Sequence, residues 1–81
     1  MKKTSITDIQ QARAIIRTVG ERHQTEVIDM LRSLTYHERS TEYERNAQKV
    51  IENMEHEYAL NIANVLWADK FDEIPQHIKN Y

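Results

Sequence analysis

The segment STEYERNAQKVIENMEHEYALNIANVLWADKFD, from Ser40 to Asp72, contains no glycine and no proline. Thr41 and Glu44 have the spacing of a capping box, which marks the start of a helix, and apolar residues recur at helical spacing along the whole segment. We therefore predict one continuous helix over about residues 41–71. A helix of about 30 residues is about 45 Å long, whereas a compact chain of 81 residues is roughly 30 Å across. The surplus length must be covered by other helices or by a second chain.

The residues before this segment predict two shorter helices. The first begins after Thr4 or Ser5, and Gly20 follows its last apolar position, where a left-handed glycine often ends a helix. Its apolar residues follow one another at intervals typical of an amphipathic helix: Ile9, Ala12, Ile16 and Val19. The second helix has Thr25 as its N-cap. Its apolar face is formed by Val27, Met30, Leu31 and Leu34.

A single proline, Pro75, marks the end of the long helix, because proline disfavours a helical residue before it. Pro75 can also begin a short final helix, Gln76 to Asn80. With one glycine and one proline in the whole chain, there is little turn chemistry for a sheet. The predicted fold class is all-α: a single helical domain over residues 1–81, built as a small three-helix domain with a long third helix (about 41–71) and a short C-terminal fourth helix.

The predicted long helix has two apolar faces when its residues are placed on a helical wheel. The first face runs along the whole helix and comprises Tyr43, Ala47, Val50, Ile51, Met54, Tyr58, Ile62 and Val65. The second face lies on the far side of the C-terminal half and comprises Leu60, Trp67 and Phe71. A helix that is apolar on two sides is normally buried on two sides. The two shorter helices can cover the first face, whereas the second face needs another cover.

Two candidates can cover this second face: the tail of the same chain or a second protein chain. Trp and Tyr are enriched in the hot spots of protein interfaces, and both residue types occur near the C-terminus. We therefore expect the chain to be at least a dimer or to bind another protein. The predicted partner-binding residues are Leu60, Trp67, Phe71, Ile74, Ile78 and Tyr81.

A weakly basic N-terminal half provides an alternative function. Residues 1–49 hold nine Lys/Arg and seven Asp/Glu, a formal charge of +2, whereas residues 50–81 hold two and six, a formal charge of −4. The candidate phosphate ligands are Lys2, Lys3, Arg13 and Arg17. Acidic residues are interleaved with them, and the total charge of −2 differs from the strongly basic balance of a dedicated nucleic-acid binder. A nucleic-acid-associated transcriptional modulator is therefore the alternative to a protein-binding module.

No residue pattern predicts catalysis, a metal site or a cofactor. The chain has no cysteine, and its four histidines lie one in each predicted segment, without the spacing that puts two metal ligands on one helix face. A single glycine excludes a phosphate-binding loop of the P-loop type. We therefore predict that the protein is not an enzyme.

The sequence also predicts a protein without a membrane partner. No segment approaches the ~18 apolar residues of a membrane-spanning helix, and no apolar core of a signal peptide follows the first residues. We expect a cytoplasmic protein. The predicted function is that of a small regulator, inhibitor or adaptor that self-associates or binds a target protein through an apolar face of its long helix.

Overall fold

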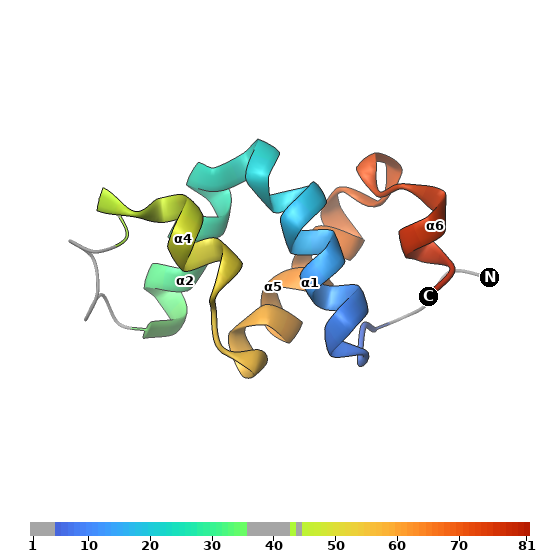
Figure 1. Ribbon diagram of the computed structural model, residues 1–81, viewed down its shortest axis with the longest axis horizontal. Helices are drawn as coiled ribbons and strands as arrows, with labels where there is room; N and C mark the ends of the chain where they lie inside the picture. Colours follow the sequence, from blue (N-terminus) through green and yellow to red (C-terminus); the bar gives the residue numbers. More distant parts are fainter. Residues whose placement is uncertain (1–4, 36–42, 44) are drawn as a thin grey trace.

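The computed structural model describes residues 5–35, 43 and 45–81, and every regular element in these residues is helical (Figure 1). The α-helices are α1 (Ile9–Thr18), α2 (Gln24–Thr35), α4 (Ala47–Glu52), α5 (His56–Asp69) and α6 (Gln76–Lys79). Two short 3₁₀ helices connect them: η1 (Gly20–His23) joins α1 to α2, and η2 (Phe71–Glu73) follows α5. The all-α prediction is confirmed for this part of the chain.

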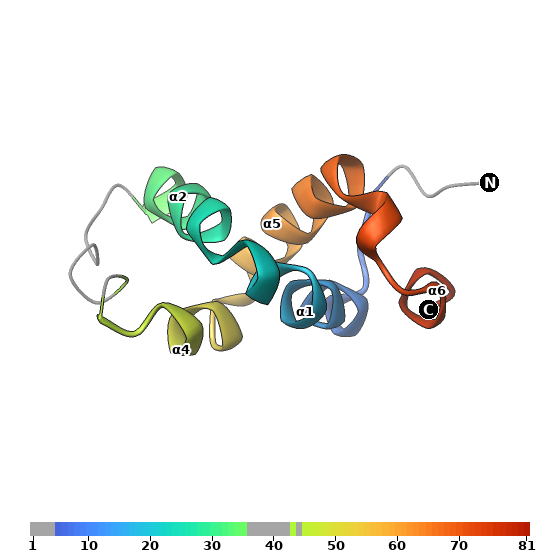
Figure 2. The ribbon, with the colours of Figure 1, turned by 90° about the horizontal axis from the view of Figure 1, so that it is seen from above.

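The helices form two layers, which Figure 2 shows from above. Helices α2 and α5 form one layer, α1 and α4 form the other, and α6 lies next to α1 at one end of the molecule. The molecule measures 40 × 20 × 19 Å, and its buried apolar side chains form a cluster to which each α-helix contributes. Each helix therefore has one face toward this core and one face toward solvent.

Helix α1 packs mainly against α5. Ala12 of α1 and Ala59 and Ala63 of α5 have no exposed surface. Small side chains at a helix contact permit a short distance between the axes, and the isoleucines on either side of them fill the remaining space. This pair of helices forms the centre on which the other elements pack.

Helix α1 begins later than the sequence predicts. Its N-cap is Asp8, whose carboxylate accepts hydrogen bonds from two backbone N–H groups of the first turn at 2.8 and 3.1 Å. Of the predicted start points, Ser5 precedes this cap and Thr4 lies outside the described residues. The cause is a tertiary contact: the N–H of Ile6 donates to Asn64 Oδ1 at 2.6 Å, and Asn64 Nδ2 donates to the Ile6 carbonyl at 3.1 Å. This pairing with α5 holds the residues before Asp8 outside a helix.

The connection after α1 also differs from the prediction. Gly20 does not adopt a left-handed conformation, because its φ is not positive, and it begins η1 instead. This 3₁₀ turn leads directly into α2, which starts at Gln24, one residue before the predicted N-cap Thr25.

The predicted continuous helix over residues 41–71 is not present. Helix α4 ends at Glu52 and α5 begins at His56, so residues 53–55 separate two helices. The predicted capping box, Thr41 and Glu44, lies outside the described residues. The three-helix description therefore needs correction: in the described part of the segment that we predicted as one long helix, α4 and α5 are separate helices.

A tertiary contact holds the break between α4 and α5, which contains neither glycine nor proline. The side chain of Met54 is buried, and its carbonyl accepts a hydrogen bond from Arg13 Nη1 of α1 at 3.0 Å. In a continuous helix this carbonyl would accept from the backbone N–H four residues later. Asn53 closes α4, since its backbone N–H and its Nδ2 both donate to the Lys49 carbonyl, at 3.1 and 2.9 Å.

The predicted first face is only partly buried along α5. On one continuous helix, Ile51 and Val65 would lie about 40° apart around the axis, and the predicted first face contains both. In the structure Ile51 is 1 % exposed and Val65 is 48 % exposed. The side of α5 that carries Val65 therefore faces solvent.

The end of the chain follows the local prediction closely. The backbone is extended at Ile74 and Pro75, and α6 starts at Gln76, with Pro75 as the residue before its first turn. The predicted short C-terminal helix is present. Its core contribution is Ile78, which is buried together with Ile74.

Candidate interaction surface

The predicted partner-binding residues lie mostly inside the chain's own fold. Trp67, Ile74 and Ile78 are each 3 % exposed, and Leu60 and Phe71 are half-buried. Tyr81 alone among the six is exposed, at 54 %. The structure thus brings five of these residues into or against the core, and the tail of the same chain provides cover for the second apolar face.

The tail is held on this face by specific contacts. The rings of Trp67 and Phe71 meet edge to face with centroids 4.8 Å apart, a favoured geometry for aromatic pairs. The Lys79 ammonium lies 4.0 Å from the centre of the Phe71 ring, within the range of a cation–π contact. Gln11, which has no exposed surface, donates from Nε2 to the carbonyl of Ile78 at 2.9 Å. With these contacts, the tail covers Trp67 on the second face.

Exposed apolar side chains lie instead between α2 and α5. Leu34 is 36 % exposed and Val65 is 48 % exposed, and both line a hollow of about 250 Å³. We call this hollow the α2–α5 groove; its lining residues are Met30, Ser33, Leu34, Asn61, Ile62 and Val65. The sequence predicted an apolar face on each of the two helices, but it did not predict that exposed residues of both would line one hollow. The reason is that Val65 was assigned to the core side of an unbroken helix.

The two helices that border the groove run antiparallel. At one end of the pair, Glu26 of α2 lies 3.2 Å from Lys70, just beyond α5. Farther along, Leu34 shares the lining of the groove with Asn61. Side chains four residues apart lie on the same helix face, so Met30 and Leu34 form one wall. Val65 stands on the opposite wall.

Carboxylates continue these walls beyond the groove. Glu26 lies one helical turn before Met30, Asp29 one turn before Ser33, Glu57 one turn before Asn61, and Asp69 one turn after Val65. All four carboxylates are exposed. Among the described residues, the nearby cations are Arg32, which lies 3.9 Å from Asp29, and Lys70, so these residues give the surroundings of the groove an acidic excess.

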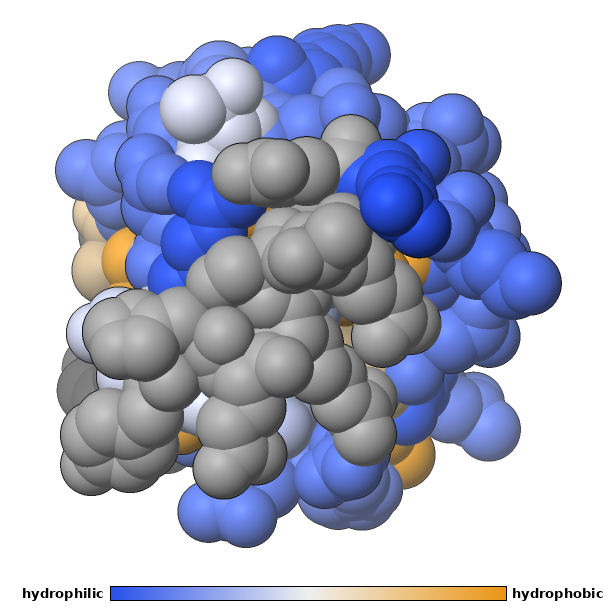
Figure 3. Space-filling view, turned by 90° about the vertical axis from the view of Figure 1, so that its left-hand side faces the viewer, coloured by the Kyte–Doolittle hydropathy of each residue, from blue (hydrophilic) through white to orange (hydrophobic). Residues whose placement is uncertain are grey.

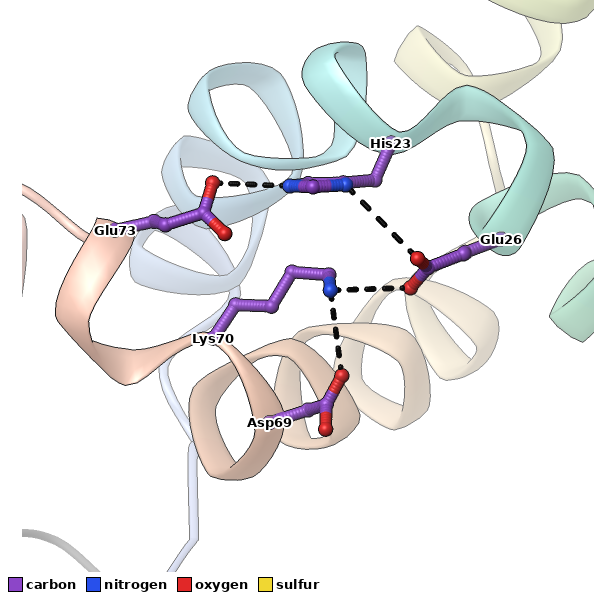
Figure 4. A network of polar contacts seen from close by, with 5 residues as sticks. All are labelled: His23, Glu26, Asp69, Lys70 and Glu73. Carbon is purple, nitrogen blue, oxygen red and sulfur yellow. Dashed lines mark hydrogen bonds and ion pairs between the residues drawn. The ribbon is translucent and has the colours of Figure 1, made fainter.

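A polar network closes one end of the helix pair (Figure 4). Lys70 Nζ lies 3.2 Å from Glu26 and 3.4 Å from Asp69, and the hydrogen bond with Glu26 raises the pKa of this lysine. His23 Nε2 donates to Glu73 Oε1 at 2.9 Å, and this bond lowers the pKa of Glu73. The network joins η1 and α2 to the C-terminal end of α5 and to η2.

Of the predicted phosphate ligands, the structure describes Arg13 and Arg17. Arg13 is half-buried and donates to the Met54 carbonyl, whereas Arg17 is exposed. The two arginines border a small hollow together with Glu52, so a carboxylate lies beside them. Lys2 and Lys3 lie outside the described residues.

Charge separates the two layers of the fold. Helices α1 and α4 carry three basic residues and one acidic residue, a formal charge of +2. Helices α2 and α5 carry one basic residue and four acidic residues, a formal charge of −3. The acidic layer is the one that contains the groove.

Figure 3 faces the end of the molecule that α2 and α4 form, where the coloured surface is mostly hydrophilic and apolar atoms show only in small areas.

Within the part of the chain that the structure describes, no group of three or more His, Cys, Asp or Glu side chains has the arrangement of a metal site. None of the described helices combines the length and apolarity needed to span a membrane. Comparison with known proteins finds no matching family model, no matching curated protein and no matching solved structure.

Proposed function

We propose that this protein is a non-enzymatic helical interaction module that binds a target protein through the α2–α5 groove. The observation that carries the proposal is the exposure of Leu34 and Val65 on the lining of one hollow. The apolar residues of the core are at most 7 % exposed, so these two side chains differ clearly from the core. Apolar hollows with polar borders are typical of surfaces on which proteins dock.

The dimensions of the groove favour a protein side chain over a small cofactor as its occupant. Pockets for drug-sized ligands have volumes of about 300–1,000 Å³, and the groove measures about 250 Å³. It is also far larger than the ~30 Å³ share of one water molecule. One or two apolar side chains from a partner would fill it.

The experiment compares exposed apolar residues on two surfaces. The variants Val65→Gln and Leu34→Gln remove apolar groups from the groove, and Tyr81→Gln removes the large apolar side chain that is exposed on the tail. Each tagged protein is used to capture partners from its source cells, after circular dichroism has verified its helix content. We expect both groove variants to lose partners that the wild type and Tyr81→Gln retain. Capture that survives both groove variants, or that only Tyr81→Gln abolishes, would overturn the assignment of the groove.

Self-association is tested separately, since a dimer was also expected from the sequence. Sedimentation of the wild type measures the mass of the particle, and the same measurement on Val65→Gln shows whether the groove holds two copies together. A monomer at all accessible concentrations would contradict the dimer prediction without affecting the capture of a target. The cytoplasmic location stays a prediction, and so does the alternative of nucleic-acid binding through Lys2, Lys3, Arg13 and Arg17.

A further inference from the structure

We infer that the α2–α5 groove takes a basic amphipathic helix from another protein: apolar side chains one helical turn apart, flanked by Lys or Arg. This inference rests on the proposed function and adds the chemistry of the partner. Two antiparallel helices with an apolar hollow between them form the usual receptor for the apolar face of a third helix. Met30 and Leu34, one turn apart on the same wall, fit two partner side chains with the same spacing.

The charges around the groove determine the polar part of the partner. Each wall continues into carboxylates. The side chain of Asp29 is 67 % exposed, and Glu57 is also exposed. Arg32 lies 3.9 Å from Asp29, and Lys70 shares its charge between Glu26 and Asp69. Among the described residues, these two cations offset two of the four carboxylates and leave a formal charge of −2. Lys or Arg residues on both sides of the partner's apolar stripe would meet complementary charge.

A second copy of this chain fits the groove poorly. A symmetric pair places the same patch of both chains face to face, which would bring the carboxylates of one copy against those of the other. The α1–α4 layer of a second copy has the complementary positive charge. However, the large apolar residues that are exposed in the described chain are Leu34, Val65 and Tyr81, and none of them belongs to α1 or α4. That layer therefore offers charge without an apolar anchor.

The same acidic excess argues against a nucleic acid or an anionic membrane on this face, because both carry negative charge. A basic amphipathic helix would place apolar side chains in the hollow and positive charges beside the carboxylates of the walls.

The test uses two designed peptides that differ only in charge. Each has about 15 residues, enough for a marginally stable isolated helix, with leucines one turn apart and with either lysines or glutamates on the flanking positions. Binding of each labelled peptide to the full chain is followed by fluorescence anisotropy at low and high salt. We expect the lysine peptide to bind about tenfold more tightly at low salt, which corresponds to about 1.4 kcal/mol, and to lose this advantage at high salt.

Variants of the chain locate the binding. The neutralising double variant Asp29→Asn/Glu57→Gln should weaken the lysine peptide about three- to tenfold, because each exposed ion pair contributes modestly. The matched control Glu52→Gln removes an exposed carboxylate from α4, in the opposite layer, and should change nothing. Val65→Gln should weaken both peptides.

The outcomes separate the two proposals. Equal binding of both peptides, abolished by Val65→Gln, would overturn the basic partner while supporting the groove as the docking surface. Binding of the lysine peptide that is insensitive to Val65→Gln would show attraction by charge alone and would overturn the inference. Absence of binding by either peptide would also overturn it, and the capture experiment would then decide the proposed function independently.

Discussion

The hydrogen bond from Gln11 to the tail makes the sharpest stability prediction. Gln11 has no exposed surface, and its Nε2 donates to the Ile78 carbonyl at 2.9 Å. The substitution Gln11→Met keeps the length of the side chain and removes the amide donor. A buried acceptor that loses a partner costs about 1–3 kcal/mol. The Ile78 carbonyl keeps a long bond from the Tyr81 N–H at 3.4 Å, and the four residues of α6 can detach and rehydrate it, so we expect a loss near the lower limit.

A loss of about 1–1.5 kcal/mol lowers the thermal midpoint of a chain of this size by about 4–12 °C. The second readout is the fluorescence of Trp67, which is 3 % exposed beneath the tail and should shift to the red when α6 detaches. Amide hydrogen exchange over residues 76–79 should quicken in the variant. The matched control is Gln10→Met, an exposed neighbour in the same helix. If Gln11→Met melts like Gln10→Met and the tail amides keep their protection, the bond does not hold α6 in place.

Three further predictions concern other contacts. Arg13→Met removes the donor to the Met54 carbonyl and should lower the free energy of unfolding by about 1–2 kcal/mol, as measured by urea denaturation. An unchanged urea midpoint would show that the break between α4 and α5 does not depend on this bond. Gly20→Ala should raise stability by about 0.4–1 kcal/mol, because φ is not positive and the added Cβ would meet its nearest atom at 3.4 Å; a lower thermal midpoint would contradict this. Glu73 has a lowered pKa because of its bond with His23, so its contribution to stability is present above the ordinary pKa of 4.5 and is lost as the pH falls through and below that value. The wild type should therefore have a higher thermal midpoint than Glu73→Gln at pH 6, and this difference should vanish in acid. A difference that grows in acid would contradict the prediction.

Local rules predicted those parts of the fold that local chemistry determines. The all-helical class followed from the scarcity of glycine and proline, and the start of α6 followed from Pro75. Helix α5 ends at Asp69, two residues before the predicted end of the long helix. The break at residues 53–55 could not be predicted in this way. Its determinants are the burial of Met54 and the bond from Arg13, two residues that are 41 positions apart. The start of α1 is similar, since the contact between Ile6 and Asn64 spans 58 positions.

The candidate site was hidden by the same break. A continuous helix aligns Val65 with Ile51 and assigns both to the core, whereas the structure exposes Val65 beside Leu34. Five of the six residues chosen from the sequence, Trp67 among them, lie in or against the chain's own core. Their cover proved to be the tail, which was one of the two candidates. The exposed groove depends on how α5 packs against α1 and α2, which only the folded chain defines.

The charge of the two helix layers differs from the charge of the two halves of the sequence. The sequence divides into a basic first half and an acidic second half, but α2 belongs to the first half and carries Glu26 and Asp29 into the acidic layer. The basic layer is left with α1 and α4, where Arg13 is committed to the Met54 carbonyl and Glu52 borders the same hollow as Arg17. Within α1 and α4, Arg17 and Lys49 are the other cations, and nucleic-acid affinity grows with the number of phosphates neutralised. The two alternative functions thus belong to opposite layers, and substitutions that neutralise one layer leave the other intact. Loss of partner binding on neutralising Asp29 and Glu57, with no effect from Arg17→Gln, would assign the activity to the groove; the reverse result would assign it to the basic layer.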